Sequence, residues 1–443
     1  MPLTPLPAGI APLGPCLADW AGETVLLGFS GGGDSLALLH LATGWASETR
    51  STLRPVIIDH GLRSESASEA DRAARQAHAL GWTPVVERWD ATKPATGLQA
   101  AARRFRLETF ARRAREVGAT AVLLGHTRDD QAETVWRRLL AGSGLEGLSA
   151  MSIIDPLPLW PEGRAISLVR PLLGARRAAL REWLSQRGED WIDDPSNANR
   201  AFSRVRDRAV LARLETGGFD PARLAGLADK VARYQRSQAE IAGRWLMQHA
   251  VFHAWGGISL DRHKAAPWRA MEAMRAAVSG EPAPQSAAAR KLAVAMRSGE
   301  AITAGGAALG YRGDQAFLFR DPGHVTGRAD RSRHRRGTAA MGEIGIWDGR
   351  FEIRSKKIRI RPFSDCAADG FDTDRLGPVP PAARPGLPAI WENDRFQGLA
   401  GLDPDFPSVR WLASELMARN LFGDRPPPWF HTQLRDQSAQ GSH

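Results

Sequence analysis

An apolar run of strand length leads directly into a glycine-rich turn near the start of the chain, and this pair of features limits the fold most. Residues 24–29 read TVLLGF and residues 30–35 read SGGGDS, and apolar residues at helical spacing follow from Leu36 onward. In a strand–loop–helix unit, glycines let the backbone approach an anion closely, and the helix N-terminus adds partial positive charge. The unit therefore predicts a phosphate site at residues 30–35.

The polar side chains of this loop leave two interpretations open. Ser30 and Ser35 could donate hydroxyl hydrogen bonds to phosphate oxygens, whereas a bare phosphate would repel Asp34, so that residue suggests a bridging cation such as Mg²⁺. A tight turn in which Asp34 or Ser35 caps the helix explains the same residues equally well. The loop also lacks the Gly-Lys-Ser/Thr ending of a Walker loop and the G-x-G-x-x-G dinucleotide fingerprint.

Charge and cysteine content limit the partners and the compartment. The net charge is +10 and the pI about 10.4, which favours a polyanionic partner over the alternative of charge for solubility alone. Cys16 and Cys366 are the only cysteines, so no disulfide framework or zinc spacing is present and a reducing cytosol fits. The N-terminus lacks the pattern of a signal peptide, and no apolar run approaches transmembrane length. We therefore expect a cytoplasmic protein without a membrane partner.

Apolar runs of strand length recur along the first half of the chain, with helical patterns between them. The further strands are expected at 55–59, 83–87, 119–125 and 166–169, and the helices at 68–80, 97–117, 129–140 and 175–187. This alternation predicts an α/β fold with a doubly wound, Rossmann-like parallel sheet. Ligands bind such sheets at the carboxyl ends of the strands. The glycine loop, Asp59–Gly61 and Gly125–Thr127 all follow strands at such ends, which favours a functional loop.

A length of 443 residues predicts two or three domains. We expect an α/β domain over 1–218 and a mostly helical middle domain over 219–322, with a hairpin or pair of strands at 301–320. A basic linker is expected over 323–340, because residues 323–337 are polar and rich in arginine. Short strands with Gly/Pro turns predict a small α+β domain over 341–443, with a frayed tail after Phe430.

The segment GHTRDDQAET at 125–134 is the second strong signal. Asp130 and Glu133 are three residues apart, so both lie on one face of the expected helix, and His126 lies in the loop before them. Two carboxylates at this sheet edge could hold a metal, a cationic substrate, or both. Taken alone, the better explanation is that they are first-turn acids favoured by the helix dipole.

Three weaker segments would each, in isolation, be turns or solvated faces. They are Asp59-His60-Gly61-Leu62-Arg63, the arginines Arg103, Arg104 and Arg106, and Asp193-Asp194-Pro195-Ser196-Asn197 with the trailing arginines Arg204, Arg206 and Arg208.

In combination these segments resemble the bacterial tRNA(Ile)-lysidine synthases, a family within the PP-loop (N-type) ATP pyrophosphatases. The resemblance rests on SGGGDS, DHGLRSESASEA, GHTRDDQAET, AGSGLEGL, and DPSN followed by Arg-x-Arg-x-Arg, whose order and spacing match over about residues 24–208. Beyond residue 208 only the layout of the domains matches. The chain departs from the family at Thr127-Arg128, where His-Ala or similar is frequent, and at Leu107, where an aromatic residue is frequent.

The resemblance implies a two-step reaction. ATP adenylates the C2 carbonyl oxygen of the wobble cytidine in an isoleucine tRNA with a CAU anticodon. The ε-amine of free L-lysine then attacks C2, and AMP leaves. The implied partners are this tRNA and L-lysine, the implied cofactors are ATP and Mg²⁺, and a homodimer is an open option because the family is often dimeric.

The resemblance also implies roles for individual residues. ATP would bind at Ser30, Gly31, Gly32, Gly33, Asp34, Ser35 and Asp59, with Asp34 also holding the metal. Lysine would bind at Asp130, Glu133, Arg103 and Arg106, and tRNA at Arg204, Arg206 and Arg208. The catalytic set would be Asp34, His126, Asp130 and Glu133. Which of His126, Asp130 and Glu133 accepts a proton stays open, as does the division of roles between Arg103 and Arg106.

Two other functions would also use a nucleotide fold of this kind. A tRNA thiolase of the PP-loop type commonly needs cysteines near the ATP site, whereas Cys16 lies before the first strand and Cys366 lies far away in the sequence. A nucleic-acid-binding protein with an inactive nucleotide fold would have no need of Asp34, Asp130 and Glu133 together. Both alternatives therefore fit the sequence less well.

Overall fold

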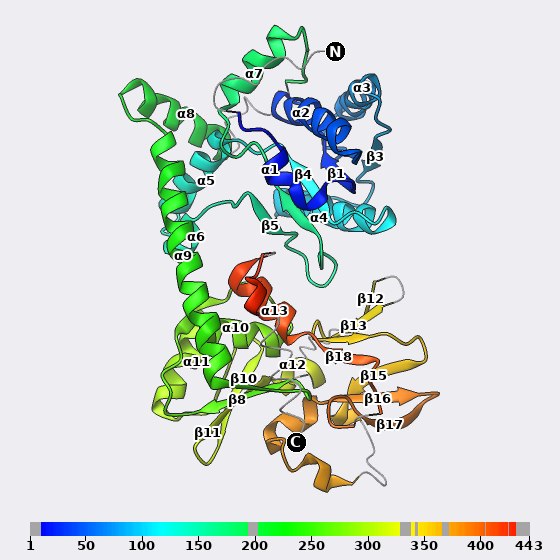
Figure 1. The fold of residues 1–443 in the computed structure, drawn as a ribbon, viewed down its shortest axis with the longest axis vertical. Coiled ribbons are helices and arrows are strands. Elements are labelled where there is room, and N and C mark those ends of the chain that lie inside the picture. The colour runs from blue at the N-terminus through cyan, green and yellow to red at the C-terminus, as the bar shows by residue number, and fades with distance from the viewer. Residues whose placement is uncertain are drawn as a thin grey trace. The chain divides into compact units, whose positions relative to one another are not determined.

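The computed structural model describes residues 10–193, 203–327, 338–341, 344–365, 372–403, 405–423 and 425–430. The chain forms two compact units (Figure 1). Unit 1 comprises Met1–Leu159 and Gly163–Gln235, and unit 2 comprises Trp160–Glu162 and Arg236–His443. The finer division into four segments stays a prediction, and residues 328–337 of the expected linker and the tail after Phe430 lie outside the described residues.

Unit 1 is built on a six-stranded sheet in the order β3-β2-β1-β4-β6-β5. Its strands are β1 (Thr24–Gly28), β2 (Thr52–Asp59), β3 (Val85–Arg88), β4 (Ala121–Leu124), β5 (Ile154–Pro156) and β6 (Ser167–Val169). All neighbours pair in parallel except β5, which runs antiparallel to β6. The predicted doubly wound parallel sheet is confirmed, and β5 is an addition that the sequence did not reveal. The strand order reverses at β1, between β2 and β4, where such sheets bind ligands.

Alternate residues of the central strands pack on opposite faces of this sheet. In β1, Val25 and Leu27 join one apolar cluster and Leu26 joins another. The helices of unit 1 are α1 (Gly14–Leu17), α2 (Gly33–Thr49), α3 (Ser66–Ala79), α4 (Leu98–Glu116), α5 (Arg128–Leu140), α6 (Leu145–Leu148), α7 (Arg177–Gln186), α8 (Ser203–Thr216) and the start of α9 (Ala222–His249), with the short η1 (Ala18–Trp20). Apolar residues of α2, α3 and α7 pack on the face of Val25, and those of α4 on the face of Leu26 (Figure 1). Because side chains alternate along a strand, the apolar run builds two cores at once.

Helices α5, α8 and α9 pack together at one side of this unit. Their contact consists of small and branched apolar side chains, namely Ala132, Val135, Leu211, Leu224 and Ala228. An ion pair of 3.0 Å between Arg137 and Asp207 also joins α5 to α8. Arg208 of α8 thereby lies beside the helix that carries Asp130 and Glu133.

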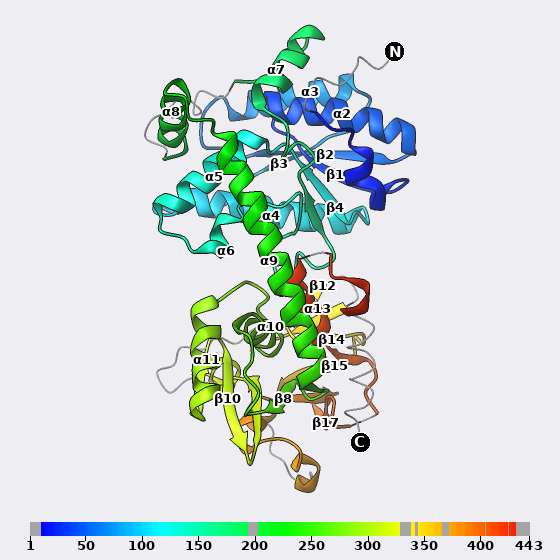
Figure 2. The ribbon, with the colours of Figure 1, turned by 60° about the vertical axis from the view of Figure 1, so that its left-hand side comes forward.

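Unit 2 contains a five-stranded antiparallel sheet in the order β7-β8-β11-β10-β9. Its strands are β7 (Ala250–His253), β8 (Gly257–Asp261), β9 (Ile302–Ala304), β10 (Ala307–Arg312) and β11 (Gln315–Arg320), and the nearby helices are α10 (Trp268–Ser279), α11 (Ser286–Ser298) and α12 (Pro322–Thr326). Helices α10 and α11 pack against this sheet (Figure 2). The helical middle region and the strands predicted at 301–320 are confirmed. Strands β7 and β8 were not predicted, because they are short and β8 pairs with β11, more than fifty residues away.

The C-terminal part of unit 2 is rich in short strands, as predicted. One sheet holds β12 (Thr338–Met341), β13 (Ile344–Trp347), β14 (Phe351–Ile353) and β18 (Val409–Trp411), and another holds β15 (Ile358–Pro362), β16 (Pro388–Glu392) and β17 (Arg395–Leu399). The helical elements are η3 (Phe363–Asp365), η4 (Thr373–Leu376), η5 (Pro381–Gly386) and α13 (Ala413–Phe422). Leu416 and Met417 of α13 share an apolar core with Met274 and Val278 of α10.

None of the helices in the described ranges has the length and apolar character that crossing a bilayer requires.

Candidate active site

The glycine loop connects the end of β1 at Gly28 to the start of α2 at Gly33. Its shape is held by short polar contacts. The Ser35 hydroxyl donates to the Gly32 carbonyl at 2.9 Å, and the Ser30 N–H donates to the Ser35 hydroxyl oxygen at 3.3 Å. Gly31 has a φ of +73°, which L side chains rarely adopt. The loop is therefore pre-shaped by its own residues, and it leads into a helix N-terminus as the sequence predicted.

Gly31 also lacks room for a side chain. A Cβ at this position would lie 2.5 Å from Cδ1 of Ile192, whose N–H donates to the Gly31 carbonyl at 2.9 Å. We expect Gly31→Ala to lower the free energy of unfolding by ~2–4 kcal/mol, from left-handed backbone strain and overpacking together. Gly81→Ala is the matched control, because Gly81 has a φ of +84° with nothing within 4 Å of a Cβ. Gly81→Ala should lower the free energy of unfolding only by the backbone strain, ~1–2 kcal/mol. Denaturant titration of both variants measures the difference, and equal losses would contradict a packing role for Gly31.

The start of α5 places Asp130 by a capping box. The Asp130 N–H donates to the Thr127 hydroxyl oxygen at 3.4 Å, and the Thr127 N–H donates to Oδ2 of Asp130 at 2.9 Å. The interpretation of Asp130 as an acid of the first helical turn is therefore correct for one carboxylate oxygen, which completes the cap. The other oxygen, Oδ1, accepts a hydrogen bond from the guanidinium of Arg177 at 3.0 Å. Asp130 thus serves both the helix and the site.

Arg177 is the residue at which the acidic side chains of the site meet. Besides Asp130, its guanidinium pairs with Asp34 of the glycine loop at 2.9 Å and with Glu133 at 3.5 Å. Its backbone N–H donates to the Asp129 carboxylate at 2.8 Å. The N-termini of α2, α5 and α7 are thereby held around one guanidinium, 19% of whose side chain is exposed.

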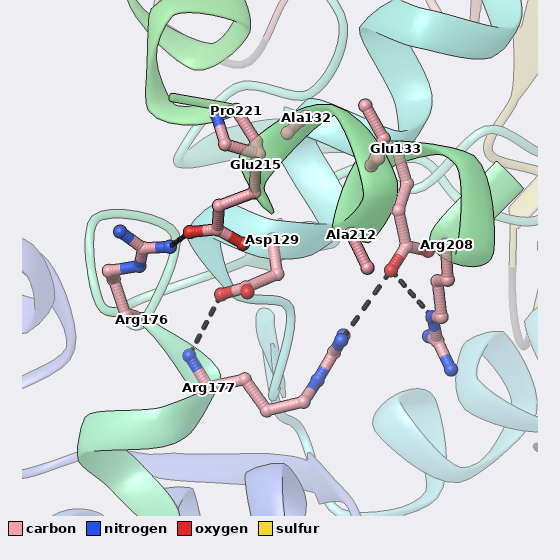
Figure 3. A pocket seen from close by; sticks show the side chains of 10 residues that line it. Asp129, Ala132, Glu133, Arg176, Arg177, Arg208, Ala212, Glu215 and Pro221 are labelled. Carbon is pink, nitrogen blue, oxygen red and sulfur yellow. Dashed lines mark hydrogen bonds and ion pairs between the residues drawn. The ribbon is translucent and has the colours of Figure 1, made fainter. Parts of the chain in front are cut away.

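A second arginine reaches the same carboxylates from α8. The Arg208 guanidinium lies 2.6 Å from Glu133 and 3.8 Å from Asp130, so Glu133 pairs with two arginines (Figure 3). A cavity of about 200 Å³ lies beside them. Its lining carries charges of both signs, from Asp129, Glu133, Glu215, Arg176, Arg177 and Arg208. The rest of the lining is apolar and consists of Ala132, Leu211, Ala212 and Pro221.

Burial and charge pairing shift the pKa values of Asp34 and Asp130 in opposite directions. Burial raises the pKa of Asp34 above its ordinary value, and the charge of Arg177 only partly offsets this. Burial acts in the same direction on Asp130, but the charge of Arg177 and the hydrogen bonds from Thr127 outweigh it and lower the pKa of that carboxyl. Burial disfavours the charged form of Arg177, and the charges of Asp130 and Asp34 outweigh it and raise the pKa of the guanidinium. The site therefore keeps Asp130 and Arg177 ionised at neutral pH.

Asp34 has a carboxylate oxygen that could coordinate a cation beside bound phosphates. Its Oδ2 pairs with Arg177, whereas its buried Oδ1 has no hydrogen-bond partner among the residues that the structure describes. Within those residues, no group of three or more His, Cys, Asp and Glu side chains could hold a metal by itself. Mg²⁺ is commonly held by one or two carboxylates together with substrate phosphates, and Asp34 fits that pattern.

Other predicted residues take positions around this centre. Asp59 is buried at the end of β2, where its carboxylate accepts the Gly61 N–H at 2.8 Å and shapes the turn. His126 lies close enough to Asp130 for its charge to act on that carboxyl. Arg103 is exposed on α4, and Arg106 lies near His60, whose pKa is lowered chiefly by burial and also by this arginine. The arginines seen pairing with Asp130 and Glu133 are Arg177 and Arg208, so a lysine contact of Arg103 or Arg106 stays a prediction.

Residues 191–193, which follow α7, pack against the glycine loop. Trp191 lies against Gly33, and Asp193 pairs with Arg181 at 3.2 Å. Asp194–Asn197 of the DPSN motif and Cys366 lie outside the described residues, as does the side chain of Arg204. Arg206 is exposed on α8. Arg208 points at the acids of the site in the structure, and its contact with tRNA stays a prediction.

The sequence did contain a signal for Arg177 that the predictions missed. Arg177 is the first residue of α7, where the positive end of the helix dipole disfavours a cation. The helix also follows β6, so its N-terminus lies at the same sheet edge as the glycine loop. An arginine in such an unfavourable position indicates that carboxylates nearby hold it.

Comparison with known proteins bears on the family of the chain. Residues 13–214 match the family described as the PP-loop domain. A tRNA(Ile)-lysidine synthase from Caulobacter vibrioides is 34% identical over 373 residues, covering 83% of this chain and 84% of that protein. A tRNA(Ile)-lysidine synthase from Rhizobium meliloti is 36% identical over 362 residues, covering 77% and 76%.

A solved structure of the U34-tRNA thiolase NcsA from Methanococcus maripaludis is 16% identical, with a TM-score of 0.40, and covers 47% of this chain and 72% of that chain. That likeness is too low to bear on activity. The relatives from Caulobacter and Rhizobium extend well beyond the PP-loop domain, over most of both chains. The chain therefore belongs to the tRNA(Ile)-lysidine synthase family.

Proposed function

We propose that this chain is an ATP-dependent ligase that joins L-lysine to C2 of the wobble cytidine in an isoleucine tRNA with a CAU anticodon. The observation that carries the proposal is the meeting of Asp34, from the nucleotide loop, with Asp130 and Glu133 around Arg177. The proposed phosphate site and the proposed site for an ammonium group would thereby be adjacent, as the joining of lysine to an adenylated base requires. Membership of the family supports the same reaction.

In the first step the C2 carbonyl oxygen attacks the α-phosphate of ATP and pyrophosphate leaves. The backbone N–H groups of Gly31, Gly32 and Gly33, with the hydroxyls of Ser30 and Ser35, would stabilise the charge on the departing pyrophosphate. Asp34 would hold Mg²⁺, which would neutralise phosphate charge when bound. Asp59 would act on ATP indirectly, because its carboxylate shapes the turn after β2.

In the second step the ε-amine of lysine attacks C2, the bond from C2 to the adenylate oxygen breaks, and AMP leaves. Asp130 and Glu133 would bind and orient the lysine through its ammonium charge, and Arg103 or Arg106 would face a carboxylate or phosphate. The attacking amine must lose a proton, and His126, Asp130 and Glu133 are the candidate acceptors.

The tRNA is proposed to bind through cations on α8 and beyond. Arg206 is exposed on this helix, and the net charge of +10 favours a polyanion. Arg208 pairs with Glu133, so we assign it to the lysine site in addition to any contact with phosphate. The proposed compartment is the cytoplasm, and light scattering in solution would distinguish a monomer from the homodimer that the resemblance leaves open.

Transfer of radiolabelled lysine to tRNA tests this function. With ATP, Mg²⁺ and the CAU-anticodon isoleucine tRNA, label should enter the tRNA, and the elongator methionine tRNA should remain unlabelled. Exchange of labelled pyrophosphate into ATP should require the same tRNA. Incorporation of sulfur in place of lysine would indicate a thiolase, and tRNA binding with neither exchange nor label would indicate a binding protein.

A further inference from the structure

The carboxylates proposed to receive the lysine ammonium are already neutralised by guanidinium groups. Oδ2 of Asp130 accepts from Thr127 at 2.9 Å and Oδ1 from Arg177 at 3.0 Å. Oε1 of Glu133 accepts from Arg208 at 2.6 Å and lies 3.5 Å from Arg177. Both acids are largely buried, so their pairing with these cations is only weakly screened by solvent. Both carboxylates proposed to bind the ammonium group therefore already have a guanidinium partner, which the ammonium group would have to replace.

The Arg177 guanidinium has a second class of partner close at hand. Its Nε donates to Oδ2 of Asp34 at 2.9 Å, and Asp34 is a residue of the glycine loop. A planar guanidinium binds phosphate in a bidentate manner and with a charge-assisted strength that matches its binding to carboxylate. Phosphates bound at this loop would therefore compete with Asp130 and Glu133 for Arg177.

Arg208 is the less suitable candidate for such an exchange. It approaches Glu133 and Asp130 from α8, and the structure shows no contact between it and Asp34 among the described residues. Arg177 alone pairs with the acids of both proposed substrate sites within that part of the chain. The exchange of partners must therefore act through Arg177.

We propose that Arg177 is a positioning residue that couples the two substrates. Before ATP binds, its guanidinium pairs with Asp130 and Glu133. When ATP binds, its phosphates pair with the guanidinium, and the lysine ammonium then takes the place of the guanidinium beside the two carboxylates. The inference rests on the proposed function and deepens it. It predicts that ATP binds before lysine. Lysine is thereby excluded from the site until ATP, which activates the base, is bound.

Coupling of this kind is reciprocal. If bound nucleotide strengthens lysine binding by a given factor, lysine must strengthen nucleotide binding by the same factor. Coupling between two sites in one protein typically amounts to ~5–150-fold. For the wild type we expect nucleotide to strengthen lysine binding by about tenfold or more. The reason is that lysine binding must otherwise break the charged contacts of Arg177 with Asp130 and Glu133.

Isothermal titration calorimetry tests the coupling directly. Lysine is titrated into the full chain with and without a non-hydrolysable ATP analogue and Mg²⁺. The wild type should bind lysine about tenfold or more tightly with the analogue present. Arg177→Gln should bind lysine without nucleotide more tightly than the wild type does, and the analogue should change its affinity by less than about twofold.

Arg112→Gln is the matched control. Arg112 lies on α4 and also pairs with two glutamates, Glu87 at 2.6 Å and Glu116 at 3.3 Å. This variant should keep the coupling of the wild type. Arg177→Met, which retains much of the aliphatic stem without the charge, replaces Arg177→Gln if circular dichroism shows that the latter fails to fold.

Two results would overturn the inference. One is equal lysine affinity of the wild type with and without the analogue. The other is full coupling in a folded Arg177 variant. Either result leaves the proposed function standing if the wild type still transfers labelled lysine to tRNA. The absence of that transfer, by contrast, would refute the proposed function whatever the coupling.

Discussion

Asp34→Asn should lower the rate of tRNA-dependent ATP–pyrophosphate exchange by at least about 100-fold, the scale of losing one group that stabilises charge in a transition state. The side chain supplies the carboxylate oxygen of the glycine loop that is left for a cation. An amide has nearly the same shape but carries no charge, so phosphate charge would no longer be balanced there. Asp34→Ala should behave in the same way.

The same substitution should leave the protein folded. Burial raises the pKa of Asp34 above 3.8, so the ionised form is disfavoured in the folded state. Any stabilisation from this proton is present below the unfolded pKa and is lost as the pH rises through the folded pKa. At neutral pH the charge therefore costs stability, which offsets part of the loss of the Arg177 pair. Thermal melts at pH 7 measure the outcome.

Asp71→Asn, at an exposed position of α3, is the matched control and should keep both the exchange rate and the melting temperature. A folded Asp34→Asn variant with a rate near that of the wild type would show that Asp34 serves only as a residue of the helix start. The exchange assay isolates adenylation, because it needs no lysine in the proposed scheme.

Glu133→Gln and Asp130→Asn should each raise the KM for lysine by about 10–100-fold, because losing a charge-assisted contact costs ~1.5–3 kcal/mol. Both carboxylates lie on one face of α5, and both contact Arg177. The amides keep the shape of the side chains, and Asn at position 130 can still accept the Thr127 N–H. The KM for ATP should change less. Steady-state transfer of labelled lysine at varied lysine and ATP measures both constants.

Glu108→Gln, at an exposed position of α4, is the control for loss of a surface ion pair and should leave both constants unchanged. Equal increases in the two constants for the variants at 130 and 133 would point to a shared metal site or a disrupted α5. An unchanged lysine KM in folded variants would move the lysine site away from these carboxylates.

Local sequence alone determined much of the first unit. Apolar runs of strand length predicted the strands around β1, and the glycines at 31–33 with Asp34 predicted a loop that opens a helix. The spacing of Asp130 and Glu133 placed them on one helix face, and the structure confirms it. These predictions succeeded because each depends on residues within a few positions of one another, where periodicity and turn chemistry act directly.

Only the tertiary structure decided which charges meet. Arg177 reaches Asp34 across 143 positions of sequence, and Arg208 reaches Glu133 across 75. The same is true of Trp160, whose indole N–H donates to the Gly349 carbonyl at 2.7 Å within unit 2, across 189 positions. Such contacts depend on how separate helices pack against a shared sheet or core, and no local pattern specifies the partner. The acids of the site could therefore be predicted from the sequence. For the arginine that joins them, the sequence held only the unfavourable position of Arg177 at a helix N-terminus, and the acids with which it pairs could not be predicted.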